Sequence, residues 1–168
     1  MKLRKLIGLL SILFILIYPV LSLCVENENM SIATLRPGKG IGNINIGDKL
    51  EDVVKKMGKK PSEGKTVTAG NNVQYWLIYK PQGLTFVFDR NSALVSIIVT
   101  NPVMRIPNSN IRINSSSKEL NSAYGDGRSA VINDNYEQRI YDKKGMNFMI
   151  NKGSGKVETI TIMPKTDN

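Results

Sequence analysis

An internal match between the two halves of the chain constrains its fold more than any other feature of the sequence. Residues 43–58 ("NINIGDKLEDVVKKMG") align with residues 110–125 ("NIRINSSSKELNSAYG") at an offset of 67. Residues 79–100 align with residues 141–162 at an offset of 62, with six identities. Two blocks that match in the same order, with one change of loop length between them, indicate a tandem duplication. We expect a first repeat at 40–102 and a second at 103–168.

Each repeat is expected to begin with a short strand and a short helix. The strands are the Ile-x-Ile segments at 44–46 and 111–113. Each helix is expected to start at a capping box and to end at a left-handed glycine, because these residue types satisfy the free backbone groups at helix ends. The residues concerned are Asp48, Glu51 and Gly58 in the first repeat and Ser116, Glu119 and Gly125 in the second.

Three strands are expected to follow each helix, after a variable loop. They lie at 73–79, 83–89 and 93–100 in the first repeat and at 136–142, 145–151 and 156–163 in the second. In the middle strands, apolar residues alternate with others at Leu84, Phe86 and Phe88, and again at Met146, Phe148 and Ile150. This alternation predicts that one sheet face packs on the helix. The fold class is therefore α+β, with two tandem units of one short helix on a three- to four-stranded antiparallel meander.

The motifs "IGDKLEDVVKKMGKKP" and "Y…GLTFVF", with their echoes "INSSSKELNSAYG" and "Y…GMNFMI", resemble the β-lactamase inhibitory protein fold. A single unit is also similar to the small lipoprotein of the outer-membrane β-barrel assembly machinery. The resemblance covers about residues 40 to 163 and implies a fold, since these motifs form structure rather than a site. It places no inhibitory or assembly-factor contact residue on this sequence. The inhibitory proteins carry disulfides, whereas this chain has one cysteine.

The N-terminus has the composition of an export segment. Lys2, Arg4 and Lys5 precede an uncharged run at 6–25, which is just long enough to cross a bilayer. We expect residues 1–24 to be a signal peptide or membrane anchor and residues 25–39 to be a linker. The body is then extracytoplasmic.

Three interpretations of that segment stay open. Pro19 favours a cleaved signal peptide, because proline ends the apolar helix. Cys24 indicates lipidation instead, since the apolar Leu21 stands three residues before it, although Leu23 is larger than the residue usual before such a cut. The third interpretation is an uncleaved anchor with its basic end inside.

Composition excludes several kinds of chemistry. The sequence has no histidine, which removes histidine-based catalytic triads and histidine metal ligands, and its single cysteine allows no internal disulfide. Without the three basic residues of the N-terminal segment, 20 basic and 14 acidic residues leave a net charge of +6, spread in pairs such as Lys55-Lys56 and Lys143-Lys144, which is typical of a solvated surface. We therefore expect no enzyme, no cofactor, no metal and no nucleic-acid partner.

Four local patterns have the residue types of a site but are interpreted as structural. The glycines of "GKGIGN" (38–43) lack the spacing of a phosphate loop or a dinucleotide fingerprint. The acidic pair Glu51 and Asp52 and the serines at 115–117 suit helix capping. The oxygen-rich "NDNYE" (133–137) lacks the spacing and central glycine of a calcium loop.

Aromatic residues in the expected sheets are the best candidates for function. Rigid aromatic side chains on an open sheet face are good anchors for a protein partner. The candidate binding residues are Tyr75, Trp76, Tyr79, Val87, Tyr141 and Met149. Period-two reasoning does not fix which parity of the first strands faces the helices, and packing between the two units is the competing interpretation of this surface.

The sequence as a whole predicts an exported, non-enzymatic protein that binds a protein or cell-envelope component through an extended sheet surface. The alternative is an envelope-tethered lipoprotein, modified at Cys24, that acts as a structural or assembly factor. In both cases the membrane is contacted only through the N-terminal segment.

Overall fold

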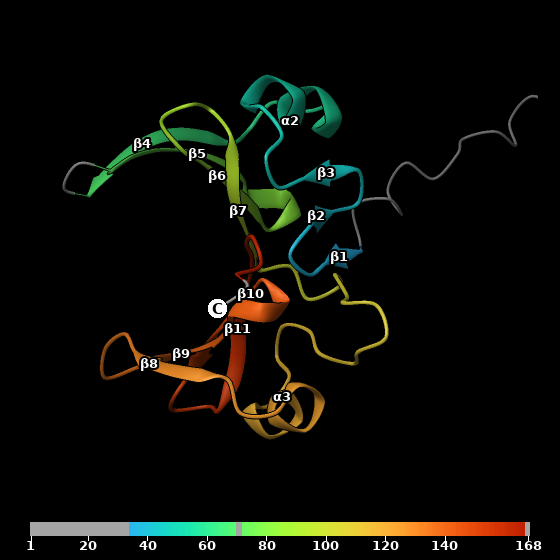
Figure 1. Cartoon of the computed structure of the whole chain (residues 1–168), viewed down its shortest axis with the longest axis vertical. Helices are drawn as coiled ribbons and strands as arrows, with labels where there is room; N and C mark the ends of the chain where they lie inside the picture. Colours follow the sequence, from blue (N-terminus) through green and yellow to red (C-terminus); the bar gives the residue numbers. More distant parts are fainter. Residues whose placement is uncertain (1–33, 70–71, 167–168) are drawn as a thin grey trace, which may run out of the picture.

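Eight strands form one antiparallel sheet in the computed structural model, which describes residues 34–69 and 72–166 (Figure 1). Their order is β4-β5-β6-β7-β11-β10-β9-β8. The strands are β4 (Glu63–Ala69), β5 (Asn72–Tyr79), β6 (Leu84–Phe88), β7 (Leu94–Val99), β8 (Arg128–Val131), β9 (Tyr136–Tyr141), β10 (Met146–Asn151) and β11 (Lys156–Ile162). Because β7 pairs with β11 at the centre, each half of the chain supplies four neighbouring strands.

The remaining elements lie on one face of this sheet. They are the small sheet of β1 (Leu35–Arg36), β2 (Gly40–Ile41) and β3 (Ile44–Asn45), and the helices α2 (Leu50–Met57) and α3 (Ser117–Tyr124). Figure 1 shows them together on one side, while the large sheet curves away from them and leaves its concave face without a covering element among the described residues. Neither helix is long and apolar enough to cross a membrane.

One hydrophobic core runs through both halves. The alternating residues of β6 (Leu84, Phe86 and Phe88) and of β10 (Met146, Phe148 and Ile150) are all buried on the covered face. They belong to one cluster with Val53 of α2 and Leu120 of α3. The predicted packing of a sheet face on the helices is therefore confirmed, and the α+β class with it.

Six strands form where the sequence predicted them, and two strands were missed. β4 and β8 occupy parts of the expected variable loops. The expected strand at 111–113 is wrong, since residues 112–115 form a turn in which the Ser115 amide donates to the Arg112 carbonyl. Ile44 has β2 as a partner strand, whereas 111–113 has none among the described residues. Ile111 and Ile113 are nevertheless buried.

The linker expected at 25–39 reaches into the fold. Leu35 is fully buried in β1, and its amide donates to the Arg105 carbonyl at 2.9 Å. Residues 34–39 are thus part of the small sheet rather than linker. The expected signal peptide or anchor and the rest of the linker lie outside the described residues.

The strand pairing corrects the sequence alignment by one residue. Phe86 pairs with Ile97, and Phe148 pairs with Ile160. Residues of β6 and β10 therefore correspond at an offset of 62, whereas residues of β7 and β11 correspond at an offset of 63. The difference arises because the turn between β10 and β11 is one residue longer than the turn between β6 and β7. The aligned identity of Ile98 with Ile160 does not correspond to a structural match.

Each helix has one end that agrees with the prediction and one end that does not. Ser116 and Glu119 form the expected capping box. The capping box predicted at Asp48 is wrong: α2 is capped by Lys49, which makes no side-chain cap hydrogen bond. Gly58 is left-handed, as expected, whereas Gly125 combines φ 74° with an extended ψ of −170°.

The glycine-rich stretch at 38–47 builds the turns of the small sheet. The amides of Gly38, Gly42 and Gly47 donate to the carbonyls of Gly145, Thr34 and Leu94. Gly38 packs so closely on the turn after β9 that a Cβ placed on Gly145 would lie 2.4 Å from the Gly38 Cα. These amides are used inside the protein and are not free to hold a phosphate.

Candidate binding face

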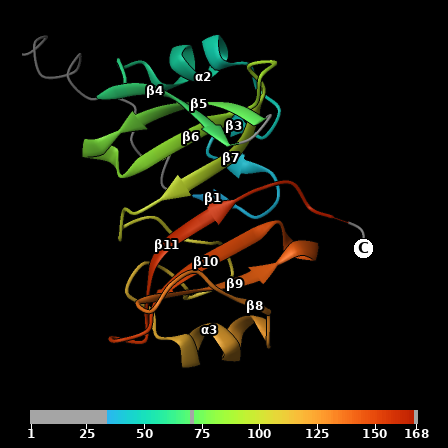
Figure 2. The ribbon, with the colours of Figure 1, turned by 90° about the vertical axis from the view of Figure 1, so that its left-hand side faces the viewer.

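The uncovered face of the large sheet, here called the open face, carries one row of residues in register across all eight strands. The row is Glu63, Ile78, Thr85, Ile98, Thr161, Asn147, Ile140 and Arg128. Charged residues stand only at its two ends. Figure 2 looks onto this face, with β4 at one end of the stack and β8 at the other. The central part of the row is thus an uncharged strip across the junction of the two halves.

The pairing of β5 with β6 decides which side chains of β5 face outwards. Tyr79 lies opposite Leu84, and Leu77 lies opposite Phe86, so these alternate residues share the covered face. Trp76 lies opposite Val87 on the open face. The parity that the sequence left undecided is therefore fixed by strand register.

The six predicted binding residues divide equally between the two faces. Trp76, Val87 and Met149 belong to the open face. The prediction is wrong for the tyrosines: Tyr75 packs against the core, and Tyr79 and Tyr141 are only 1% and 7% exposed. The two halves join edge to edge through β7 and β11 rather than by covering this face.

Tyr79 and Tyr141 are both core residues, but only the Tyr141 hydroxyl has a described hydrogen-bond partner. The Tyr79 ring meets Phe86 edge-on, and the Tyr141 ring meets Phe148 in the same way, with 5.7 Å between ring centroids in both pairs. The Tyr141 hydroxyl donates to the Gly125 carbonyl at 2.9 Å, whereas the buried Tyr79 hydroxyl has no partner among the described residues. Burial raises the pKa of both phenols.

Two neighbouring side chains position Trp76 on the open face. Its indole Nε1 donates to the Gln74 side chain at 3.2 Å. The Lys65 ammonium lies over the ring, 4.9 Å from its centroid. Trp76 stays partly exposed. Contacts from two neighbouring side chains therefore hold this large aromatic side chain in one orientation.

The other two open-face candidates differ in exposure. Val87 is 3% exposed although it lies outside the main core cluster, so neighbouring side chains on the concave surface cover it. Met149 is partly exposed between Gln138 and Thr159. Met149 is available for contact, and Val87 supports the surface from beneath.

Sequence reasoning missed three isoleucines of the open-face row. Ile78, Ile98 and Ile140 are all partly exposed. Ile78 and Ile140 each stand directly before the buried tyrosine that ends their strand. A hairpin register carried outwards from the core residues of β6 would have found Ile78, because Tyr79 pairs with Leu84 across the turn.

The polar patterns of the sequence have structural roles. The Asn133 side chain accepts the amides of Asn135 and Tyr136 and so shapes the turn between β8 and β9. Glu137 pairs with Arg139 at 3.0 Å. Within residues 34–69 and 72–166, no three potential metal-ligating side chains come together.

Two solved structures of bacterial proteins have a similar fold. The uncharacterized protein YfeY from Escherichia coli matches with a TM-score of 0.55 and 16% identity, over 75% of this chain and 97% of that chain. A DUF4309 family protein, YjgB, from Bacillus subtilis matches with a TM-score of 0.52 and 13% identity, over 82% of this chain and 93% of that chain. No family model and no curated protein sequence matches the chain. At these identities the likeness concerns the fold alone, and the resemblance to the β-lactamase inhibitory protein fold stays a prediction.

Proposed function

We propose that the protein is an exported, non-enzymatic binding protein whose open face holds a protein or another cell-envelope component. The observation that carries this proposal is the uncharged strip that crosses the six inner strands, from β5 to β9, on a concave face with no described cover. Interfaces are depleted of charge at their centres and concentrate binding energy in a few rigid aromatic and apolar residues. Trp76, Ile98 and Met149 provide such residues on this strip and beside it.

The curvature of the sheet fits this role. The outer strands of both halves bend towards the open side, so a partner would meet the ends of the row as well as its centre (Figure 1). The charged ends, Glu63 and Arg128, each form an ion pair within the protein, with Lys80 at 3.4 Å and with Asp142 at 3.1 Å. The ends of the row would therefore form a polar rim around an uncharged centre.

We also infer that the two halves are tandem copies that share the β-lactamase inhibitory protein fold. Support comes from their turns: Gly83 has φ 61° and ψ 39°, and Gly145 has φ 64° and ψ 43°. The strand pairs β6–β7 and β10–β11 shift register at matching places, after Val87 and after Met149. Duplication would place Ile78 and Ile140 at matching positions and so double the length of one binding surface.

A second candidate function is an envelope-tethered structural or assembly factor. It is favoured by Cys24, which follows the apolar run and stands three residues after Leu21. Metabolic labelling with a radioactive fatty acid tests this, with Cys24→Ala as the matched variant. Label in the parent protein that is absent from the variant supports tethering, whereas release of unlabelled parent protein from the cells contradicts it.

Substitutions on the two sheet faces test the binding proposal. Affinity capture from envelope fractions is compared between the parent protein, Trp76→Ala and Thr161→Arg. Thr161 is the central row residue, and an arginine there introduces an unpaired charge into the interface. Thr66→Arg is the matched control, because Thr66 is exposed at the outer strand and has the opposite parity.

The expected result is that Trp76→Ala and Thr161→Arg lose a partner that the parent protein and Thr66→Arg both retain. Circular dichroism and urea unfolding establish that each variant is folded. Equal capture of the same partner by all four proteins would show that the open face is not the binding surface.

A further inference from the structure

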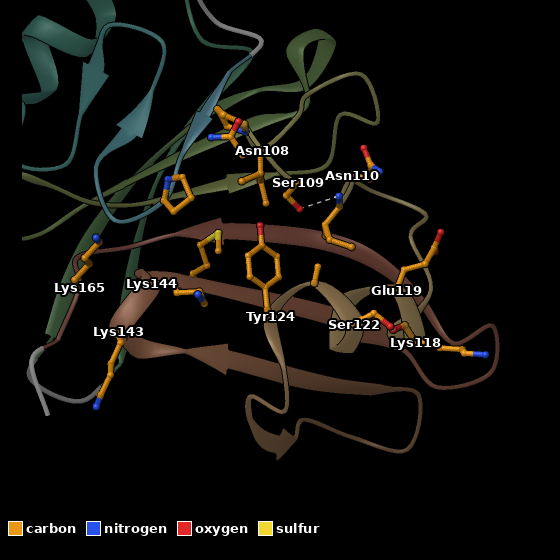
Figure 3. A pocket seen from close by; sticks show the side chains of 16 residues that line it. Asn108, Ser109, Asn110, Lys118, Glu119, Ser122, Tyr124, Lys143, Lys144 and Lys165 are labelled. Carbon is orange, nitrogen blue, oxygen red and sulfur yellow. Dashed lines mark hydrogen bonds between the residues drawn. The ribbon is translucent and has the colours of Figure 1, made fainter.

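A second candidate site lies in the second half of the molecule, on the side that carries the helices. It is a cleft of about 820 Å³ between α3, the segment at 106–111 and the 3-10 turn η3 (Asp142–Lys144) (Figure 3). Pro37 and Lys165 close one end. None of the open-face residues lines this cleft, so a ligand here would leave the sheet surface free.

The cleft has an apolar floor and a basic rim. Ile106, Ile111 and Met146 are buried beneath it, and the Tyr124 ring forms part of its wall. Four lysines line it, namely Lys118, Lys143, Lys144 and Lys165. An apolar surface next to several cations suits a ligand that combines an anionic group with an apolar body.

The positive charge of the rim is not neutralised within the described part of the chain. None of the ion pairs there includes one of the four lysines. The single acidic residue of the lining, Glu119, accepts the Ser116 amide at 2.6 Å in the capping box. That hydrogen bond holds the pKa of Glu119 below its ordinary value, so this carboxylate is committed to the helix cap.

Two of the lysines are positioned by contacts with the fold. The Lys144 ammonium lies 5.4 Å from the centroid of the Tyr124 ring. The alkyl chain of Lys165 passes over Gly38, where a Cβ would come within 2.5 Å of the Lys165 Cγ. Figure 3 shows both lysines on the same side of Tyr124, whereas Lys143 points away from that ring.

The first half of the chain shows that the fold does not require these lysines. The helix, turn and strand positions that correspond to them carry Glu51, Pro81, Gln82 and Pro102. The turns before β6 and β10 nevertheless have nearly the same backbone angles at Gly83 and Gly145. Four lysines around one cleft are therefore a property of the second half and not of the shared architecture.

We propose that this cleft binds a ligand with a carboxylate or phosphate group attached to an apolar body. The anionic group lies between Lys144 and Lys165, and the apolar body lies over Ile106, Ile111 and the Tyr124 ring. The segment at 108–110 adds hydrogen-bonding side chains along one edge. A hydrogen bond between an ammonium group and an oxyanion is stronger than one between neutral groups.

Calorimetric titration of the purified protein with hexyl phosphate tests this proposal. Inorganic phosphate has only the anionic group of this probe, and hexanol has only its apolar chain. Both are therefore expected to bind more weakly than hexyl phosphate. Lys144→Gln/Lys165→Gln is expected to weaken hexyl phosphate binding about tenfold or more, which is the size of one lost charge-assisted hydrogen bond. Lys59→Gln/Lys60→Gln removes the same charge from exposed residues outside the cleft and is the matched control.

A third variant and a spectroscopic measurement distinguish binding in the cleft from binding elsewhere on the basic surface. Lys144→Arg/Lys165→Arg keeps both charges and is expected to retain binding. Trp76 is the only tryptophan in the sequence and lies on the open face, so its emission is expected to stay unchanged when the cleft is filled. Equal weakening in the control double variant, or binding that shifts Trp76 emission and survives the loss of both cleft lysines, would overturn the proposal.

Sedimentation with phosphatidylglycerol vesicles, against phosphatidylcholine vesicles, identifies the source of the anionic group. Vesicle binding that needs Lys144 and Lys165 supports a lipid headgroup as the ligand. Binding of soluble hexyl phosphate alone, with the same lysine dependence, supports a free ligand. Absence of binding to both probes would refute the cleft as a site for apolar anions.

Discussion

Tyr79 and Tyr141 occupy matching places at the ends of β5 and β9, but only the Tyr141 hydroxyl has a hydrogen-bond partner among the described residues. Both rings make the same edge-on contact with a core phenylalanine. Comparing the two residues therefore separates the contribution of a buried tyrosine ring to stability from the contribution of its hydroxyl group.

Replacing each tyrosine by phenylalanine is expected to have opposite consequences. Tyr141→Phe removes the bond to the Gly125 carbonyl and should lower the free energy of unfolding by about 1 kcal/mol. Tyr79→Phe removes a buried hydroxyl without a described partner and should be neutral or slightly stabilising. Urea unfolding of both variants measures the difference, and equal destabilisation would mean that the Tyr79 hydroxyl is hydrogen-bonded in solution.

Adjacent residues of β10 test the assignment of the two sheet faces. Phe148 is fully buried against Tyr124 and Tyr141, whereas Met149 lies partly exposed on the open face. Phe148→Ala should cost about 3–5 kcal/mol of stability, and Met149→Ala should cost much less, because it leaves no closed cavity. Chemical denaturation gives both values. A larger loss of stability from Met149→Ala than from Phe148→Ala would show that Met149, and not Phe148, faces the core.

Strands with a buried face could be predicted from the sequence, and strands held mainly by edge hydrogen bonds could not. β6 and β10 alternate core residues at every second position, which is a direct signal. β4 and β8 show no such alternation, because each is an outer strand with mostly exposed side chains. Their pairing with β5 and β9 depends on a partner that only the folded sheet supplies.

The candidate site could be predicted only in part, for a related reason. An aromatic set on the first strands was visible in the sequence, but its division between faces depends on the turn that follows Tyr79 and pairs it with Leu84. A change of one residue in that register would exchange Trp76 and Tyr79 between the faces. The cleft could not be predicted from the sequence, because Lys118, Lys144 and Lys165 are distant from one another in the sequence and resemble ordinary surface lysines.

The starts of the two helices offer a test of capping in matched backbones. Lys49 and Ser116 have nearly identical dihedral angles, with φ −73° in both and ψ 151° and 155°. Only Ser116 caps its helix through the side chain. Lys49→Ser should therefore stabilise the protein by about 0.5–1 kcal/mol, and Ser116→Ala should destabilise it by about 1 kcal/mol.

Thermal unfolding of the two cap variants measures these effects. Lys49 also donates to the Asn91 carbonyl at 3.1 Å on the surface, so Lys49→Ala reports the cost of losing that contact alone. Lys49→Ser should be more stable than Lys49→Ala. The reverse order would show that the serine hydroxyl does not reach the free amides of α2.

The carboxyl group of Asp48 is expected to make the stability of the protein depend on pH in the acid range, in a direction that its contacts define. Partial burial acts to raise the pKa of this carboxyl group, but hydrogen bonds from the Asn45 amide at 2.8 Å and the Lys56 ammonium at 2.6 Å outweigh it. The pKa in the folded protein therefore lies below the ordinary value of 3.8. The stabilisation is complete above that value and is lost as the pH falls through the lower, folded-state pKa.

Asp48→Asn isolates this contribution, because asparagine has no charge to titrate. At pH 7 the variant should be less stable than the parent protein by about 1 kcal/mol, through loss of the charge-assisted bond to Lys56. As the pH falls through the folded-state pKa the difference should shrink, because the carboxyl group of the parent protein then loses its charge and resembles the uncharged asparagine side chain. Urea unfolding of both proteins between pH 2 and pH 7 measures it. Glu119, whose pKa is also lowered, is present in both proteins and cancels in the comparison. A difference that stays constant over this range would assign the effect to the shape of the side chain rather than to its charge.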